Sequence, residues 1–346
     1  MRPVLADLIA EFGQRFAFAG VGLRQGNRLP EFFTASAPGL GPWNEHAFLR
    51  VASISKIVTA QVLLGRLGPR SDADISAYLG WPLRHPGHPG LPVTVGQVLS
   101  HSAGLSDAGG YLIPPDMPLA EWMDGHAVWG AAPGSAFAYS NLGYILLAEA
   151  AAGADFGDAA QAWMQSAGIE GGFNWSGVAA RRNAIPCYRR TESGLEPRID
   201  AVIAPQGVSA PTGLEVPRGK IRHAGAFGPQ GGLRTSLGQC LRLAGLIPGF
   251  DQTRLWRRTD GPTEGSPDVF QDYGAGLQFL DHPPGYPRPL VGHFASAYGF
   301  VGGVWHDAAA DLSFAYMLNG MPEEDGEEDD FHTEERALFA ALADLV

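Results

Sequence analysis

Lysine is almost absent from this sequence of 346 residues. Lys56 and Lys220 are its only lysines, so arginine supplies the rest of the 24 basic side chains. Cysteine is equally scarce. Cys187 and Cys240 stand far apart and form no CxxC motif, which excludes a disulfide framework and indicates a reducing compartment.

Long hydrophobic runs are also missing. The longest apolar stretch, YILLAEAAAGA (144–154), is interrupted by Glu149 and is too short to span a bilayer. The first residues form an amphipathic helix pattern and not a secretion signal. The net charge of −12 argues against nucleic acid and anionic membranes as partners. We therefore expect a cytoplasmic protein, with 45% hydrophobic residues to form its core.

Signatures of two common hydrolase classes are absent. The ten histidines are scattered without an H-E-x-x-H motif, and HPGH (85–88) lies in a Pro/Gly-rich loop. The nearest approach to the G-x-S-x-G nucleophile elbow is GLSDA (104–108), which lacks the last glycine and follows no strand. We therefore expect no metal and no cofactor.

Strand patterns occur near both ends of the chain, around a middle rich in Pro, Gly and Ala. The expected strands are 16–23, 28–37, 273–280 and a hairpin over 299–319, and the expected helices include 1–16, 140–153, 158–167 and 332–345. This order predicts an α+β fold with one antiparallel sheet, flanked by the N- and C-terminal helices, and an inserted mostly helical region. The expected domains are 1–65 plus 226–346 and 66–225, with a functional cleft at their junction.

The segment VASISKIVTA (51–60) places Ser53 and Lys56 on one face of a predicted helix. A serine hydroxyl becomes a good nucleophile when a base removes its proton. A lysine of ordinary pKa is neutral in only about one molecule in 2,500 at pH 7, but burial can lower its pKa by up to about 3–5 units. Arginine cannot lose its proton, which is a physical reason for lysine here. A lysine that reaches the surface from a helix is the alternative for the motif alone.

Two further segments carry polar groups. PGSAFAYSNLGYILLAE (133–149) predicts a helix capped by Ser140 or Asn141, with Tyr139 at its mouth. A phenol near a lysine ammonium has a lowered pKa and can share its proton, although core packing is the alternative for Tyr139. In VGHFASAYGFVGG (291–303), His293 precedes a Gly- and Val-rich strand and is a candidate to orient or protonate a substrate, or a structural histidine.

Together these segments resemble the serine β-lactamase and penicillin-binding-protein superfamily. The likeness is to the branch of class C β-lactamases, D-aminopeptidases, D-Ala-D-Ala carboxypeptidases and related esterases. VLSHSAGL (98–105) is similar to its Leu-Ser-His-Thr-Ser-Gly-Leu segment, and GPQGGLRTS (228–236) to its Gly-Gly-Leu-x-Ser segment. The resemblance covers about residues 16–320.

The resemblance implies roles for these residues. Ser53 would form an acyl-enzyme, with Lys56 as general base and Tyr139 as proton donor to the leaving group. Asn141 would position Lys56 and the substrate. The backbone N–H groups of Ser53 and Ser296 would form the oxyanion hole, beside His293 as a substrate-orienting residue.

The third motif departs from the family pattern of Lys-Thr-Gly or His-x-Gly, because Phe294 and Ala295 follow His293. Ala295 adds a methyl group where close approach to substrate favours glycine. Phe294 suits an apolar, neutral substrate. We therefore expect a serine hydrolase acting on a small-molecule ester, amide or lactam, most simply an esterase or amidase. A true β-lactamase or D-peptidase, an acyltransferase and a non-catalytic binding protein of the same fold are the alternatives.

Overall fold

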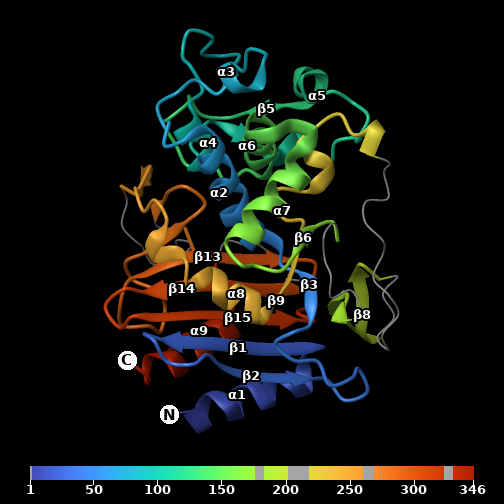
Figure 1. Cartoon of the computed structure of the whole chain (residues 1–346), viewed down its shortest axis with the longest axis vertical. Coiled ribbons are helices and arrows are strands. Elements are labelled where there is room, and N and C mark those ends of the chain that lie inside the picture. Colours follow the sequence, from blue (N-terminus) through green and yellow to red (C-terminus); the bar gives the residue numbers. More distant parts are fainter. Residues whose placement is uncertain (1, 176–182, 202–217, 260–268, 271, 323–329) are drawn as a thin grey trace.

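The computed structural model describes residues 2–175, 183–201, 218–259, 269–270, 272–322 and 330–346. An antiparallel sheet forms one half of the molecule, and a cluster of helices lies beyond one edge of it (Figure 1). The helices at the two termini pack on the sheet. This arrangement confirms the predicted α+β fold.

The main sheet joins distant parts of the chain. Its strand order is β10-β11-β12-β13-β14-β15-β1-β2. The N-terminal strand β1 pairs along its full length with β15, from Phe18 opposite Asn319 to Gln25 opposite Leu312. The strands are β1 (Phe18–Gln25), β2 (Glu31–Ser36), β10 (Trp256–Arg257), β11 (Asp272–Tyr273), β12 (Gln278–Leu280), β13 (Leu290–Ala297), β14 (Phe300–Asp307) and β15 (Leu312–Asn319).

The two faces of this sheet are covered by different helices. α1 (Arg2–Arg15) and α9 (Thr333–Ala343) pack together on one face, and α8 (Leu237–Ala244) packs on the other. Alternating strand residues supply the two cores, because successive side chains point to opposite faces. Phe314 and Tyr316 join the core under α1 and α9, whereas Ala315 and Met317 join the core shared with α8.

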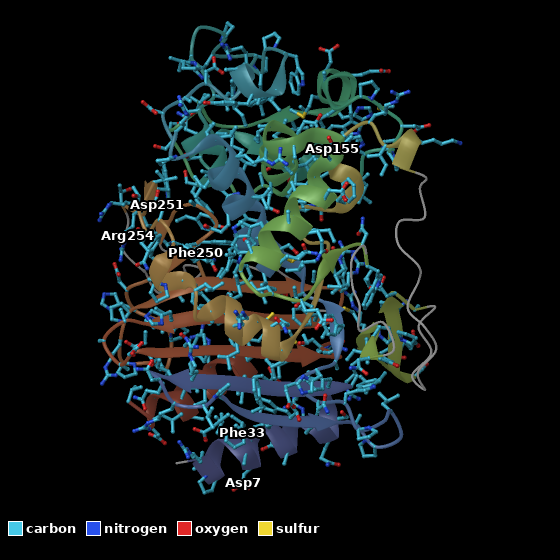
Figure 2. The ribbon with its side chains drawn as sticks, in the orientation of Figure 1. Asp7, Phe33, Asp155, Phe250, Asp251 and Arg254 are labelled. Atoms are coloured by element: carbon cyan, nitrogen blue, oxygen red, sulfur yellow. The ribbon has the colours of Figure 1, made fainter. Side chains whose placement is uncertain are left out.

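Salt bridges hold the short strands at the β10 edge of the sheet. Arg254, labelled in Figure 2, forms salt bridges with Asp272 (Nη1 to Oδ2, 2.7 Å) and with Asp281 (Nη2 to Oδ1, 2.6 Å). These two ion pairs connect β11 with the residue that follows β12.

The helical region is built around α6 (Asn141–Ala152), whose residues 142–148 are all buried. A helix that is apolar on every side belongs at the centre of a bundle. The helices around it are α2 (Ser55–Leu67), α3 (Ser76–Leu79), α4 (Val95–Leu99), α5 (Leu119–His126) and α7 (Phe156–Ser166). Although the predicted division assigns α2 to the sheet domain, it packs against α6 and α7. Across the part of the chain that the structure describes, no helix has the length and apolar character needed to cross a membrane.

Three smaller sheets lie in the part of the chain that the structure describes. The first has the order β3-β9-β6, from β3 (Phe48–Arg50), β9 (Leu233–Ser236) and β6 (Gly172–Phe173). β4 (Leu105–Ser106) pairs with β5 (Val128–Trp129), and β7 (Cys187–Thr191) pairs with β8 (Gly194–Ile199). The β7–β8 hairpin lies within the predicted helical range 66–225, yet it packs against β14 and β15 of the main sheet. The segment between β3 and α2 carries the candidate nucleophile.

Candidate active site

Ser53 lies on a short connection between β3 and α2. This connection is the 3₁₀ turn η1 (Ala52–Ile54), and α2 begins at Ser55. Ser53 therefore precedes the helix that contains Lys56, whereas the sequence predicted that both residues share one face of a helix. Ala52 has a φ of 44°, a left-handed conformation that residues other than glycine rarely adopt. Such strained backbone is concentrated at functional sites.

Lys56 is fully buried, and its ammonium or amine nitrogen has three polar neighbours. Nζ lies 3.0 Å from Ser53 Oγ, 2.8 Å from Asn141 Oδ1 and 3.0 Å from the Gln230 main-chain oxygen. Burial lowers the pKa of Lys56 to about 7, against the opposing effect of the Asp107 charge. A neutral amine has two N–H groups and one lone pair. The two acceptors take the N–H groups, which leaves the lone pair to receive the Ser53 proton.

Tyr139 reaches the same hydroxyl from the other side. Its OH donates to Ser53 Oγ at 3.0 Å, and its ring centroid lies 4.6 Å from Lys56 Nζ. Burial raises the pKa of Tyr139 well above its ordinary value, and the bond to Ser53 offsets only part of this effect. This direction is opposite to the lowered pKa expected of a phenol beside a lysine ammonium, because desolvation by burial is the largest effect on Tyr139. Tyr139 is a neutral phenol that donates a proton.

The N-terminus of α6 is held by an aspartate that sequence reasoning missed. Ser140 is the N-cap and accepts from the Gly143 N–H at 3.1 Å. Asp107 accepts from Ser140 Oγ at 3.0 Å and from the N–H groups of Asn141 and Leu142 at 2.8 and 3.1 Å. A carboxylate is favourable at a helix N-terminus, and here it fixes the backbone of Asn141, which binds Lys56. The only sequence signal for Asp107 was its position two residues after the 98–105 motif.

His101 supports the segment that carries Tyr139 and was also missed. It has a φ of 57°, and its main-chain oxygen accepts from the Ala138 N–H at 2.7 Å. Its Nδ1 accepts from the Ser140 N–H at 3.0 Å, and its ring lies 4.3 Å from the ring of Tyr139. Tyr139 is thus held by bonds to the residues on both sides of it.

The 228–236 segment locks α2 in place. Thr59 Oγ1 donates to the Pro229 oxygen at 2.7 Å, and the Leu233 N–H donates to Ser55 Oγ at 3.0 Å. The Gln230 oxygen between them binds Lys56. A Cβ atom at Gly232 would lie 2.5 Å from the Phe227 oxygen, so the tight turn of this segment requires glycine there. This explains the motif physically, because the turn aims a carbonyl at Lys56.

β12 pairs only with residues 290–292 of β13. The rest of this edge of β13 borders the nucleophile, and η1 packs against β13. The Phe294 N–H donates to Gln278 Oε1 at 2.8 Å, on the side away from β14. Because backbone groups alternate in direction along a strand, the Ser296 N–H points to the same side. It therefore points out of the sheet toward the edge where η1 lies.

A cavity of about 310 Å³ opens at Ser53. Five of the seven residues predicted for the site line it, namely Ser53, Tyr139, Asn141, Phe294 and Ser296. Lys56 does not line the cavity, but its Nζ contacts Ser53, Tyr139 and Asn141. The other described lining residues are Ala52, Tyr111, Arg189, Gln230, Gly231, Phe270, Ala297 and Tyr298. Phe270 forms an aromatic wall, with its ring 5.0 Å from that of Tyr139 and 5.4 Å from that of Phe294.

The arrangement of a serine between a buried lysine and a neutral tyrosine can be compared with known proteins. A sequence model of the beta-lactamase family matches residues 5–338, nearly the whole chain. The chain belongs to the beta-lactamase family. No curated protein matches the sequence.

Solved structures share the fold of this beta-lactamase-family chain at low sequence identity. D-amino acid amidase from Ochrobactrum anthropi SV3, complexed with L-phenylalanine amide, is 15% identical with a TM-score of 0.70, over 99% of this chain and 98% of that one. The octameric penicillin-binding protein homologue from Pyrococcus abyssi is 18% identical with a TM-score of 0.66, over 99% and 76%. A penicillin-binding protein from Bacillus halodurans is 17% identical with a TM-score of 0.62, over 99% of both chains.

This member of the beta-lactamase family differs from expectation at two residues of β13. His293 is fully buried, its ring stacks on that of Phe294 with centroids 5.7 Å apart, and its Nε2 lies 2.5 Å from the Tyr273 hydroxyl. Burial lowers its pKa to about 3, so the ring is neutral. Ala295 is also buried and belongs to the larger hydrophobic core. Neither residue lines the cavity, which differs from the substrate contact expected of His293 and from the obstruction expected of the Ala295 methyl group.

Metal ligation has no candidate in the parts of this beta-lactamase-family chain that the structure describes. No three His, Cys, Asp or Glu side chains there are grouped so that they could hold an ion.

Proposed function

We propose that this protein is a serine hydrolase that cleaves a small-molecule ester or amide through an acyl-enzyme on Ser53. The observation that carries this proposal is that Ser53 Oγ lies 3.0 Å from both Lys56 Nζ and the Tyr139 hydroxyl. One neighbour has a pKa lowered to about 7, and the other has a raised pKa. The serine is thus placed between a base that is neutral in about half of the molecules at pH 7 and an acid that is neutral there.

Acylation begins when Ser53 Oγ attacks the substrate carbonyl carbon. The Ser53 proton passes to Lys56, which becomes an ammonium bound to Asn141 Oδ1 and the Gln230 oxygen. The carbonyl oxygen gains negative charge, which the N–H groups of Ser53 and Ser296 stabilise. When the tetrahedral intermediate collapses, Tyr139 gives its proton to the leaving alcohol or amine, and the Lys56 ammonium restores that proton.

Deacylation uses the same groups in reverse order. A water molecule takes the place of the leaving group beside Tyr139. Its proton passes through Tyr139 to neutral Lys56 while the oxygen attacks the acyl carbon. The ester bond to Ser53 then breaks, Oγ regains a proton from Lys56, and the acid product leaves.

The shape of the cavity favours an apolar substrate. Phe270, Phe294 and Tyr139 form one wall, and Tyr111 and Tyr298 contribute further rings. One structural neighbour is an amidase complexed with D-phenylalanine, an aromatic product. An ester or amide with an aromatic or aliphatic group fits these walls better than a strongly hydrated one.

A fluorophosphonate probe read by intact mass tests the nucleophile directly. We expect one adduct on the wild-type protein and none on Ser53→Ala. A folded wild-type protein that forms no adduct would be a binding protein and would contradict the proposal.

Product analysis with p-nitrophenyl esters, D-amino-acid amides and a chromogenic cephalosporin tests the reaction. We expect release of the free acid with p-nitrophenyl esters. Ester or amide products formed only when an alcohol or amine is added would identify an acyltransferase. Cephalosporin turnover that exceeds ester turnover would identify a β-lactamase.

A further inference from the structure

Gln278 lies on β12 at the point where this strand separates from β13. It is opposite Gly292, and the pairing of the two strands ends there. On the N-terminal side of this pair the chain turns away and packs Gly276 against α2. Gly276 has a φ of 70°, and a Cβ atom there would lie 2.8 Å from the Lys56 main-chain oxygen, so this turn requires glycine. Within the described residues, the turn leaves β13 without a strand partner on this side at Phe294.

The side chain of Gln278 takes the place of the missing strand. It is fully buried, and its Oε1 accepts from the Phe294 N–H at 2.8 Å. Its Nε2 donates to the Val269 main-chain oxygen at 2.9 Å. The two partners fix the orientation of the amide, because a main-chain N–H needs the amide oxygen and a main-chain oxygen needs the amide NH₂ group. One side chain thus connects β13 with the segment 269–270, which belongs to no helix or strand.

The buried amide is an important support of this segment. The Val269 side chain is fully buried, and the Phe270 main-chain oxygen accepts from Arg258 Nη1 at 3.2 Å. Arg258 is only partly buried, whereas both bonds of Gln278 are buried. Loss of a buried hydrogen bond leaves an unpaired polar group and is unfavourable. The position of Phe270 relative to β13 therefore depends on Gln278.

Phe270 and Phe294 line the catalytic cavity together with Tyr139. The ring of Phe270 lies 5.4 Å from that of Phe294, edge to face, and 5.0 Å from that of Tyr139. In the proposed mechanism Tyr139 gives its proton to the leaving group, so the leaving group occupies the part of the cavity that these rings border. Aromatic rings attract one another at centroid separations of about 4.5–7 Å in edge-to-face or offset arrangements. A ring on the leaving group would therefore be stabilised there.

We propose that Gln278 is a positioning residue that fixes the spacing of Phe270 and Phe294, and that the site thereby selects substrates whose leaving alcohol or amine carries an aromatic ring. Gln278 does not line the cavity and acts through the two main-chain segments that it connects. This inference rests on the proposed hydrolase function and extends it to the class of leaving group. The proton transfers at Ser53 do not require it.

Phenyl acetate and hexafluoroisopropyl acetate test this role. They share the acyl group and have leaving alcohols of similar acidity, but only the first has a ring. The measured quantity is the ratio of their kcat/KM values, each divided by the rate of spontaneous hydrolysis. For the wild-type protein we expect the ratio to favour phenyl acetate by at least about threefold.

Gln278→Met removes both hydrogen bonds at similar volume. We expect the ratio to fall about three- to tenfold, the effect of one aromatic contact. Circular dichroism and thermal unfolding would show that the variant folds. A folded variant with the wild-type ratio, even if both esters react more slowly, would overturn the inference.

Gln278→Glu distinguishes the bond to Val269 from simple packing. A carboxylate still accepts from the Phe294 N–H but cannot donate to the Val269 oxygen, whereas a protonated carboxyl group can do both. Burial raises the pKa of a carboxyl group, so this group should gain its proton as pH falls from about 9 to 5. We expect the ratio to be low at the upper end and to recover toward the wild-type value at the lower end. A ratio that is independent of pH in the folded variant would overturn the role of this bond.

Other titratable groups near Gln278 do not disturb this comparison. Burial raises the pKa of Tyr273 on β11 well above its ordinary value and lowers that of His293 on β13 to about 3, so both stay neutral over the range. The titration of Lys56 changes the rates of both esters alike and cancels in the ratio. The wild-type ratio should therefore not depend on pH.

Gln239 provides the matched control. Its Oε1 accepts from the Glu170 N–H at 3.0 Å, and it does not line the catalytic cavity. Gln239→Met and Gln239→Glu should keep the wild-type ratio at every pH. The same loss in these variants as in the Gln278 variants would show a general effect of the substitution and would overturn the inference.

A double variant tests whether Gln278 acts through Phe270. Phe270→Leu alone should lower the ratio about as much as Gln278→Met, and the two changes together should lower it no further, because they affect the same contact. Losses that multiply in the double variant would show that Gln278 acts elsewhere and would overturn the inference.

The two esters also separate this inference from the proposed function. Hydrolysis of both esters that depends on Ser53, with no wild-type preference for the ring, would overturn only the role of Gln278. No hydrolysis of either ester and no fluorophosphonate adduct on folded protein would overturn the hydrolase function itself.

Discussion

Lys56→Arg separates the charge of this residue from its ability to lose a proton. The variant keeps a cation near Ser53 and Asn141 but replaces a group whose pKa is about 7. At pH 7 about half of the Lys56 side chains are neutral. An arginine, whose pKa lies far above 7, is neutral in fewer than about one molecule in 10⁵. We therefore expect the rate of Ser53 acylation to fall on the order of 10³-fold or more, down to the rate supported by the remaining groups.

The neutral-base mechanism also predicts the direction in which the rate of Ser53 acylation changes with pH. The active base is the neutral amine, so its fraction rises as pH increases through the Lys56 pKa of about 7. The wild-type rate should rise about tenfold per pH unit below this value and become constant above about pH 8. The same inflection should be absent from Lys56→Arg. Inactivation by a fluorophosphonate, followed from pH 5 to 9 by intact mass, measures the step without a known substrate.

The second lysine of the chain provides the matched control. Lys220 is exposed and lies in the 3₁₀ turn 218–220, so Lys220→Arg should keep the wild-type rate and pH profile. Circular dichroism and thermal unfolding would show that both variants fold. A folded Lys56→Arg protein that reacts within tenfold of wild type would refute the neutral-base mechanism.

Three further outcomes follow from the same contacts. Tyr139→Phe should lower p-nitrophenyl ester turnover by about 10²–10⁴-fold if the phenol transfers a proton, whereas a change below threefold would assign it to packing. Asp107→Asn removes the charge that raises the Lys56 pKa, so the inflection of the inactivation profile should move to lower pH, and an upward shift would contradict this cause. Lys56→Met should change how stability depends on pH. Because the folded-state pKa of Lys56 is lowered, the unfolded chain binds more protons between about pH 7 and 10.5, and the wild-type free energy of unfolding gains on the order of 4 kcal/mol from this group over that range. Urea unfolding at pH 7 and pH 10 should show that gain in wild type relative to the variant, and parallel curves would disprove it.

Much of the fold could be predicted because its elements are defined locally. The expected helix at 140–153 is α6, and its cap at Ser140 follows from the preference of serine for helix N-termini. The expected hairpin at 299–319 is β14 and β15, joined by a turn at 308–311. The position of the β7–β8 hairpin beside β14 and β15 was not predicted, because it depends on contacts between residues that are distant in the sequence. Sequence periodicity carries no information on such contacts.

Residues of the site were easier to name than to orient. Ser53, Lys56, Tyr139 and Asn141 are identified by the spacing of their motifs, and the structure brings them together. On β13 the outcome depends on tertiary contacts. Phe294 lines the cavity, whereas His293 is buried with its Nε2 2.5 Å from the Tyr273 hydroxyl, and nothing in the local sequence distinguishes these two environments.

The opposite pKa changes of Lys56 and Tyr139 have one physical cause. Burial disfavours the charged form of each group, so it lowers the pKa of the amine and raises that of the phenol. Both partners of Ser53 are therefore held in their neutral forms, one able to accept a proton and the other able to donate one. A change that admits water beside Lys56 would raise its pKa and protonate the base near pH 7. Exclusion of water by the buried residues around α2 and α6 is thus part of how this site would activate its serine, and an arginine in the same place could not respond to it.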